Sequence, residues 1–219
     1  MRRRLALLAL AAAMMVRPLA AQVPSCVAAT DPLGADSLAA LGRFWHALRA
    51  APALPRPPRA VPASLAVLHA RIDTGLGRWK EAGEVLRRVR RGDTLPDAVA
   101  LAAFAAEHLA QWGEAEAGFR LVAELPATPA DLRGRALVHR AFALEVLGRL
   151  DSARVTWRRA AQALPEVSDW LALRRAALES DTTVVVALTS VAHSPGAAQR
   201  ADAYVAQRRL AAGNAAGAL

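Results

Sequence analysis

Small apolar residues recur along residues 63–219 at the spacing of stacked helical hairpins. The recurring small position is Ala82, Ala115, Ala153, Ala187 and Ala218. The intervals between these alanines are 33, 38, 34 and 31 residues. Internal periods in this range are typical of repeat proteins built from pairs of helices, in which each pair packs only on its neighbours. The pattern therefore predicts an all-α array with its length variation in the loops between hairpins.

The positions around each alanine support two helices per unit. Four positions after each of the first four alanines stands an apolar residue, namely Leu86, Phe119, Trp157 or Val191. Residues four apart share one face of a helix, so each pair predicts a buried stripe on the second helix. Twelve positions before the alanines stand Ala70, Ala103, Ala141, Arg175 and Ala206. Small residues at four of these five positions predict a close contact between the paired helices.

Turn and breaker residues fall where the hairpins should bend and end. The short motif that begins Gly77-Arg78-Trp79 returns in degenerate form from Ala110, Gly148 and Gly213. Helix breakers follow each predicted hairpin: Gly92, Pro96, Pro126, Pro129, Pro165 and Pro195. Proline and glycine at these places interrupt helices and favour connections.

On these residues the chain resembles a tetratricopeptide-type array over residues 63–219. The likeness lies in the Gly or Ala before the turn, the aromatic at Trp79 and Trp112, the recurring alanines and the prolines between units. The resemblance implies a right-handed α-solenoid of stacked helical hairpins. The first helices lack the usual large residue and Tyr, and residues 182–186 read Thr-Thr-Val-Val-Val, a β-branched run poorly suited to helix. The last unit ends at Leu219, inside its second helix, and this predicts either a longer parent protein or a partner on the open face.

Two further segments precede the repeats. A periodic apolar stripe predicts one helix over residues 36–49, with Asp36 or Ser37 as its cap, inside an amino-terminal segment of residues 22–50. Residues 51–62 carry five prolines, which remove amide donors and favour an extended path. We expect this segment to act as a semi-rigid spacer.

Residues 1–21 have the pattern of a signal peptide. Arg2, Arg3 and Arg4 precede an apolar stretch from Leu5 to Val16, which is short for a membrane span. A cleaved signal predicts a periplasmic or otherwise exported protein of the bacterial envelope, and an uncleaved anchor is the alternative. Cleavage would remove four arginines and lower the formal charge of the chain from +9 to +5, which does not predict nucleic-acid binding.

Composition adds two constraints. About a quarter of the residues are alanine and 5% are aromatic, which favours helix over sheet. Cys26 is the only cysteine, so no internal disulfide can form. Three states of this thiol follow: free, paired with another chain, or lipidated. The sequence Val23-Pro24-Ser25-Cys26 is a poor lipidation motif. Contact with a membrane would come only through such a lipid or an uncleaved signal.

In tetratricopeptide geometry, one side of the first helices lines an inner groove. The alignment assigns to this groove Arg71, Phe104, Glu107, Arg135, Phe142, Glu145 and Glu179. Two aromatic side chains and a column of carboxylates predict a protein or peptide partner, bound as an extended peptide or through a basic segment. The alternative is an ordinary solvated face.

Dedicated chemistry is not predicted. Glu107 and Glu145 could be imagined as a glycosidase pair, but an open groove would not raise the pKa of either carboxyl group. The five histidines lack metal-site spacing, and the chain has no phosphate loop or nucleophile elbow. We therefore expect no catalytic residue, metal or cofactor. Arg87, Arg120 and Arg158 share one position on the second helices and form a candidate basic stripe.

A second resemblance is to the amino-terminal superhelical region of bacterial soluble lytic transglycosylases. It rests on the export signal, the Gly42-Arg43-Phe44-Trp45-His46 segment, the Pro-rich spacer and the segment from Asp169 to Arg174. The resemblance implies a non-catalytic, peptidoglycan-embracing portion of a longer enzyme. Glu179-Ser180 matches only the catalytic dipeptide of that family and lacks its glycine context, so no catalytic role is carried over.

Overall fold

The computed structural model describes residues 34–57, 59–89, 95–190 and 192–213. The chain divides into two units, Met1–Gly34 and Ala35–Leu219, and the described helices lie in the second. They are α2 (Ala35–Ala40), α3 (Phe44–Ala50), α4 (Ala63–Gly75), α5 (Trp79–Arg87), α6 (Pro96–His108), α7 (Trp112–Glu124), α8 (Ala130–Val146), α9 (Leu150–Ala163), the 3-10 turn η1 (Pro165–Val167), α10 (Ser168–Ala176), α11 (Thr182–Thr189) and α12 (Pro195–Ala211). The predicted signal peptide and Cys26 lie outside the described residues.

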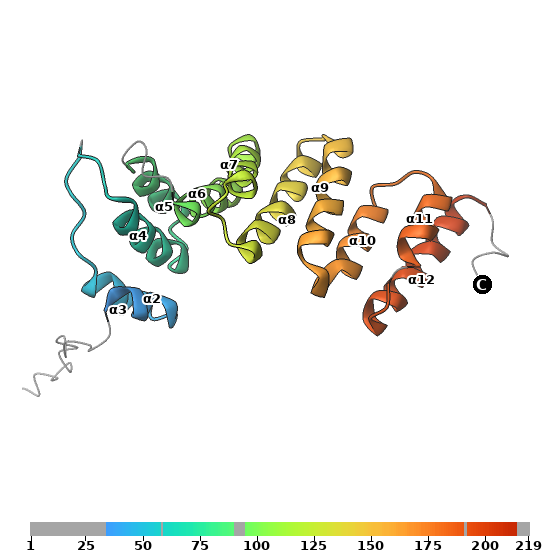
Figure 1. Cartoon of the computed structure of the whole chain (residues 1–219), viewed down its shortest axis with the longest axis horizontal. Coiled ribbons are helices and arrows are strands. Elements are labelled where there is room, and N and C mark those ends of the chain that lie inside the picture. The colour runs from blue at the N-terminus through green and yellow to red at the C-terminus, as the bar shows by residue number, and fades with distance from the viewer. Residues whose placement is uncertain (1–33, 58, 90–94, 191, 214–219) are drawn as a thin grey trace, which may run out of the picture. The chain divides into compact units, whose positions relative to one another are not determined.

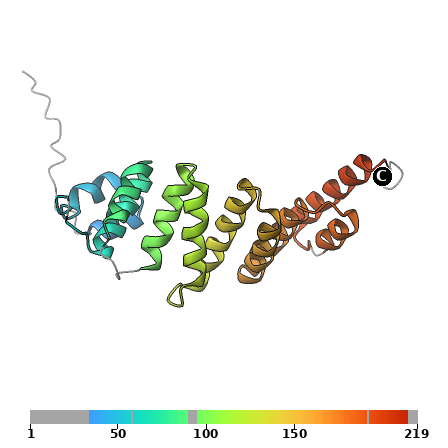
Figure 2. The same ribbon diagram turned by 90° about the horizontal axis from the view of Figure 1, so that it is seen from above.

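The fold is all-α over the described residues, as predicted. Consecutive helices pack against one another along the chain, and Figures 1 and 2 show this order. The first helices of neighbouring hairpins also touch, as α4 does with α6 and α10 with α12. None of the described helices combines the length and the apolar character that a membrane span requires.

One turn geometry joins the two helices of most hairpins. A residue in the left-handed region follows the first helix: Gly42, Gly77, Ala110, Gly148 and Gly213, with φ between 57° and 79°. In all five the amide of this residue donates to the carbonyl three residues earlier, and in the first four the next amide donates to the carbonyl five residues earlier. This is the Schellman arrangement, which satisfies the last carbonyls of a helix. Only Ala110 adopts it with a Cβ atom.

The same turn corrects the prediction for the amino-terminal helix. Residues 36–49 do not form one helix, because Gly42 takes φ +73° and separates α2 from α3. The amide of Ala47 donates to the carbonyl of Arg43, as that of Ala82 does to Arg78, and both alanines are fully buried. The α2–α3 hairpin therefore repeats the turn geometry of the later hairpins, and Ala47 stands 35 residues before Ala82 of the first predicted repeat.

The Pro-rich segment is attached to the first repeat. His69 Nε2 lies 2.8 Å from the carbonyl oxygen of Pro52. The guanidinium of Arg88 donates to the carbonyls of Pro55 and Arg59. Val61 is fully buried in the cluster that α4 and α5 form. The segment thus covers these helices rather than bridging freely to them.

Burial confirms the predicted register in the first three repeats. Ala82, Ala115 and Ala153 are fully buried. The paired apolar residues on their helices, Leu86, Phe119 and Trp157, are also buried. Each second helix therefore turns one stripe toward its partner helix.

The fourth repeat departs from the predicted register. Ala187 is exposed, and Val185 is the fully buried residue of α11. On α10 the fully buried position is Ala176 rather than Arg175. The β-branched run does form a helix, because the Asp181 carboxylate accepts a hydrogen bond of 2.7 Å from the amide of Thr183. An N-cap here replaces the left-handed turn of the other hairpins.

Candidate binding surface on the first helices

The residues assigned to the groove lie on the first helices α4, α6 and α8 and in the loop that follows α10. We call the side formed by the first helices α4, α6, α8, α10 and α12 the first-helix face. The structure brings several of them into contact with the next first helix, so many of their charges are balanced within the protein.

Glu107 and Phe104 meet His139 of the following hairpin. His139 Nδ1 lies 2.9 Å from one carboxylate oxygen of Glu107. Phe104 packs edge-on against the His139 ring, with centroids 4.7 Å apart, and against the fully buried Phe119. This cluster ties α6 to α8, and the Glu107 side chain retains only 16% exposure.

Glu145 has an equivalent role between α8 and α10. Its carboxylate accepts a hydrogen bond of 2.6 Å from the guanidinium of Arg174 and one of 2.5 Å from the indole N–H of Trp157. The Glu145 side chain is 11% exposed. A carboxylate with these donors is satisfied without a partner molecule.

The remaining assigned residues are distributed unevenly. Arg71 pairs with Asp97 of α6, while Arg135 pairs with Asp131 of its own helix. Phe142 is 37% exposed and lies edge-on to Trp112. Glu179 is largely covered and lies within ion-pair distance of Arg154 and Arg175. The seven residues do not converge on one site. Their assignment to a binding groove stays a prediction.

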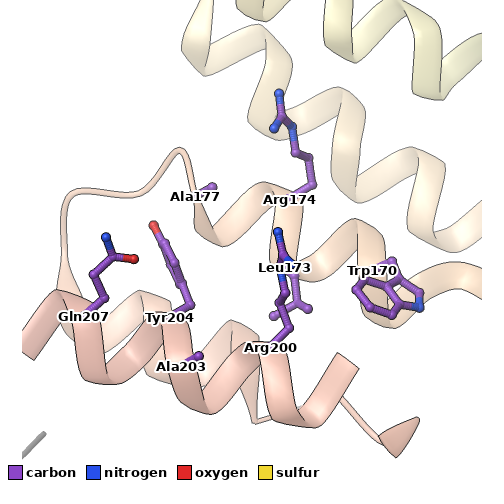
Figure 3. Close-up of a pocket in the computed structure, with 8 residues that line it drawn as sticks. All are labelled: Trp170, Leu173, Arg174, Ala177, Arg200, Ala203, Tyr204 and Gln207. Carbon is purple, nitrogen blue, oxygen red and sulfur yellow. The ribbon is translucent and has the colours of Figure 1, made fainter. Parts of the chain in front are cut away.

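A cavity of about 510 Å³ opens between α10 and α12 on this face. Figure 3 shows the side chains that line it. They are Trp170, Leu173 and Arg174 of α10, the next residue after that helix, Ala177, and Arg200, Ala203, Tyr204 and Gln207 of α12. Arg174 connects the cavity to Glu145, a residue of the predicted groove. The volume is large enough for a few side chains of a partner.

The repeat register places the cavity in line with the predicted groove. Arg200 precedes the turn residue Gly213 by thirteen positions, just as Arg135 precedes Gly148. Gln207 likewise stands six positions before its turn, as Phe142 does. The predicted groove ends at Glu179 and does not include the first helix of the last unit, although the same repeat positions recur there.

The carboxylate of Asp169, which is not among the lining residues, ties the start of α12 to α10. It accepts hydrogen bonds of 2.8 Å from the backbone amides of His193 and Ser194, at the start of α12. Both hydrogen bonds lower the pKa of Asp169, and the bond from the amide of Ser194 has the larger effect. The contact holds the first turn of α12 beside α10, which positions the cavity walls.

A second hollow of about 500 Å³ lies near the amino-terminal hairpin, where Phe44, Arg71 and Trp79 are among the lining residues. It is less suited to a charged ligand, because Arg71 is held by Asp97. Trp79 is in turn stacked on His108 at 3.6 Å. We therefore take the α10–α12 cavity as the candidate site.

The described ranges contain no group of three or more metal-ligating side chains. Asp73, buried beside α5, has a raised pKa because burial disfavours its charge more than Arg78 favours it. It lies apart from the residues that line the cavity. Arg87, Arg120 and Arg158 are exposed on the second helices, as the basic stripe requires.

Comparison of the chain with protein families, with curated proteins and with solved structures gave no match.

Proposed function

We propose that this protein is an exported, tetratricopeptide-like α-solenoid that binds a protein or peptide partner on its first-helix face. The observation that carries the proposal is the cavity between α10 and α12, which lies in register with the predicted groove and is lined by aromatic, cationic and amide side chains. Sequentially packed hairpins that repeat one turn geometry support the solenoid interpretation. Such arrays present extended surfaces to partners rather than enclosed catalytic sites.

Site-specific photo-crosslinking in cells tests the proposed face. A photoreactive amino acid replaces Gln207 or Phe142 on the first-helix face, or Arg120 or Arg158 on the second helices as matched controls. All four positions are exposed. We expect one defined adduct from the first two positions and none from the controls. Equal adducts from both faces, or adducts from the controls alone, would contradict the assignment of the face.

Export is tested separately, because it rests on the sequence of residues 1–21. Alkaline phosphatase fused after residue 50 is active only where its disulfides form, outside the cytoplasm. We expect the fusion that carries the native residues 1–21 to be active. A fusion in which the three leading arginines and the apolar stretch are replaced should be inactive. Activity that does not depend on these residues would remove the signal-peptide proposal.

A second candidate is the non-catalytic superhelical portion of a peptidoglycan lytic transglycosylase. Trp170 and Arg174, which belong to a segment that carries this resemblance, both line the cavity. An exposed indole can stack on a sugar ring, and a guanidinium can bind a carboxylate of a peptide stem. Saturable sedimentation of the protein with purified peptidoglycan, lost in Trp170→Ala, would favour this candidate. Indifference to peptidoglycan would exclude it.

A further inference from the structure

The α10–α12 cavity carries an unbalanced positive charge. Arg174 already donates to Glu145. Arg200 makes no hydrogen bond or ion pair with any of the described residues, and no carboxylate lines the cavity. An exposed guanidinium beside an apolar wall is a site for an anionic group, because charge-assisted hydrogen bonds to a carboxylate are among the stronger polar contacts. The charge of the site therefore favours an acidic ligand over the basic one that the column of glutamates predicts.

Apolar and amide groups surround this guanidinium. Arg200 shares the lining of the cavity with Leu173, Tyr204 and Trp170, which Figure 3 labels. The Trp170 side chain is 47% exposed, so its indole can be covered by a ligand. The Tyr204 hydroxyl donates to the carbonyl of Ala176 at 3.3 Å, which holds the ring against α10. Gln207, at the other end, offers an amide that can both donate and accept.

We propose that this cavity binds an acidic segment of a partner polypeptide through an internal Asp or Glu side chain. The carboxylate contacts Arg200, with the guanidinium of Arg174 at the rim. A neighbouring apolar side chain of the ligand covers Trp170, and the amide of Gln207 pairs with the ligand backbone. This inference rests on the proposed function, and it names the chemistry of the partner. A free small anion would leave the indole uncovered, so the whole lining fits a peptide better.

Fluorescence anisotropy on the full chain tests the proposal with two labelled, end-blocked peptides. One alternates leucine with glutamate, and the other alternates leucine with lysine. We expect the acidic peptide to bind and the basic peptide not to bind. Arg200→Gln should weaken the acidic peptide about tenfold or more, the loss expected when a charge-assisted hydrogen bond is removed. Trp170→Ala should weaken it several-fold through lost apolar contact.

Arg149→Gln is the matched control, because it removes the same charge from an exposed position in the turn between α8 and α9, outside both the cavity and the candidate basic stripe. We expect it to leave the affinity within about a factor of two, as exposed charges outside a site contribute little. Circular dichroism of each variant verifies that the helices are retained. Arg200 has no partner in the described residues, so its replacement should not affect folding.

Each outcome decides the proposal. Binding that Arg149→Gln weakens as much as Arg200→Gln would show attraction to net charge, and would overturn the cavity as the site. Binding of the basic peptide, or of soluble peptidoglycan fragments in place of the acidic peptide, would overturn the ligand chemistry. If the acidic peptide fails while the photoreactive group at Gln207 captures a partner, this inference fails and the proposed function stands. If both fail, the proposed function fails as well.

Discussion

The close contact between α6 and α7 at Gly118 predicts that an alanine there destabilises the protein. A Cβ atom added there would lie 2.8 Å from the Cβ of Ala103 and 3.4 Å from its Cα. Carbon atoms pack best at about 3.5–4.0 Å, so the two helices would have to separate. Gly118→Ala should gain about 1 kcal/mol of helix propensity and lose about 1–3 kcal/mol to overpacking. We expect a net loss of stability of up to about 2 kcal/mol.

Gly83 provides the matched control within α5. The added Cβ would lie 3.6 Å from the Arg87 guanidinium and 3.9 Å from the Cβ of Ala105, which are ordinary contacts. Gly83→Ala should therefore stabilise the protein by about 1 kcal/mol, since only the propensity term applies. Urea unfolding followed by far-ultraviolet circular dichroism measures both free energies of unfolding. Equal stabilisation by the two variants would refute the close packing of α7 against Ala103.

Four other substitutions test the register and the electrostatics. Ala115→Arg should destabilise the chain by several kcal/mol, because it forces a charge into a fully buried position. Ala187→Arg, at an exposed position, should be nearly neutral. Thermal melts of both variants measure the difference, and equal losses of stability would contradict the register found in α11. Ala110→Gly should raise the free energy of unfolding by about 1 kcal/mol by relieving the strain of a Cβ at φ +57°; an unchanged urea midpoint would contradict that strain. Asp73→Asn should stabilise the protein at neutral pH. The pKa of Asp73 is raised in the folded chain, so the stability of the native chain falls as the pH rises from 3.8 through that raised pKa. The difference between variant and native chain should vanish in melts below pH 3.8, and a variant less stable than the native chain at neutral pH would refute the raised pKa. Asp169→Asn should be less stable than the native chain near neutral pH, and this deficit should disappear as the pH falls through the lowered pKa of Asp169; a deficit that persists in acid would show that charge is not its cause.

The sequence predicted the paired helices well where alanines and breakers agree. Helix starts at Pro96 and Pro195 follow from the residue itself, because proline is tolerated in the first turn. The hairpin at Gly42 was within reach of the same reasoning, since Gly42-Arg43-Phe44 matches Gly77-Arg78-Trp79. The apolar stripe continues across this turn, so the spacing of apolar residues alone does not show that a single left-handed residue divides the helix.

The candidate site was harder to predict for a physical reason. The sequence places Glu107 and Glu145 on one face, but it does not show that His139 and Arg174 approach them from the next hairpin. These contacts depend on the loop between units, whose length varies. The fourth repeat also departs from the predicted register, and Asp181 caps α11 where the other hairpins have a left-handed turn.

Hydrogen–deuterium exchange of the full chain, with and without the acidic peptide at saturating concentration, tests the central claim most directly. A ligand bound between two helices reduces their local opening. We predict added protection in α10 and α12, centred on Trp170 and Arg200, with no change in α7 and α9. Protection confined to the second helices, or spread evenly over the chain, would contradict binding on the first-helix face.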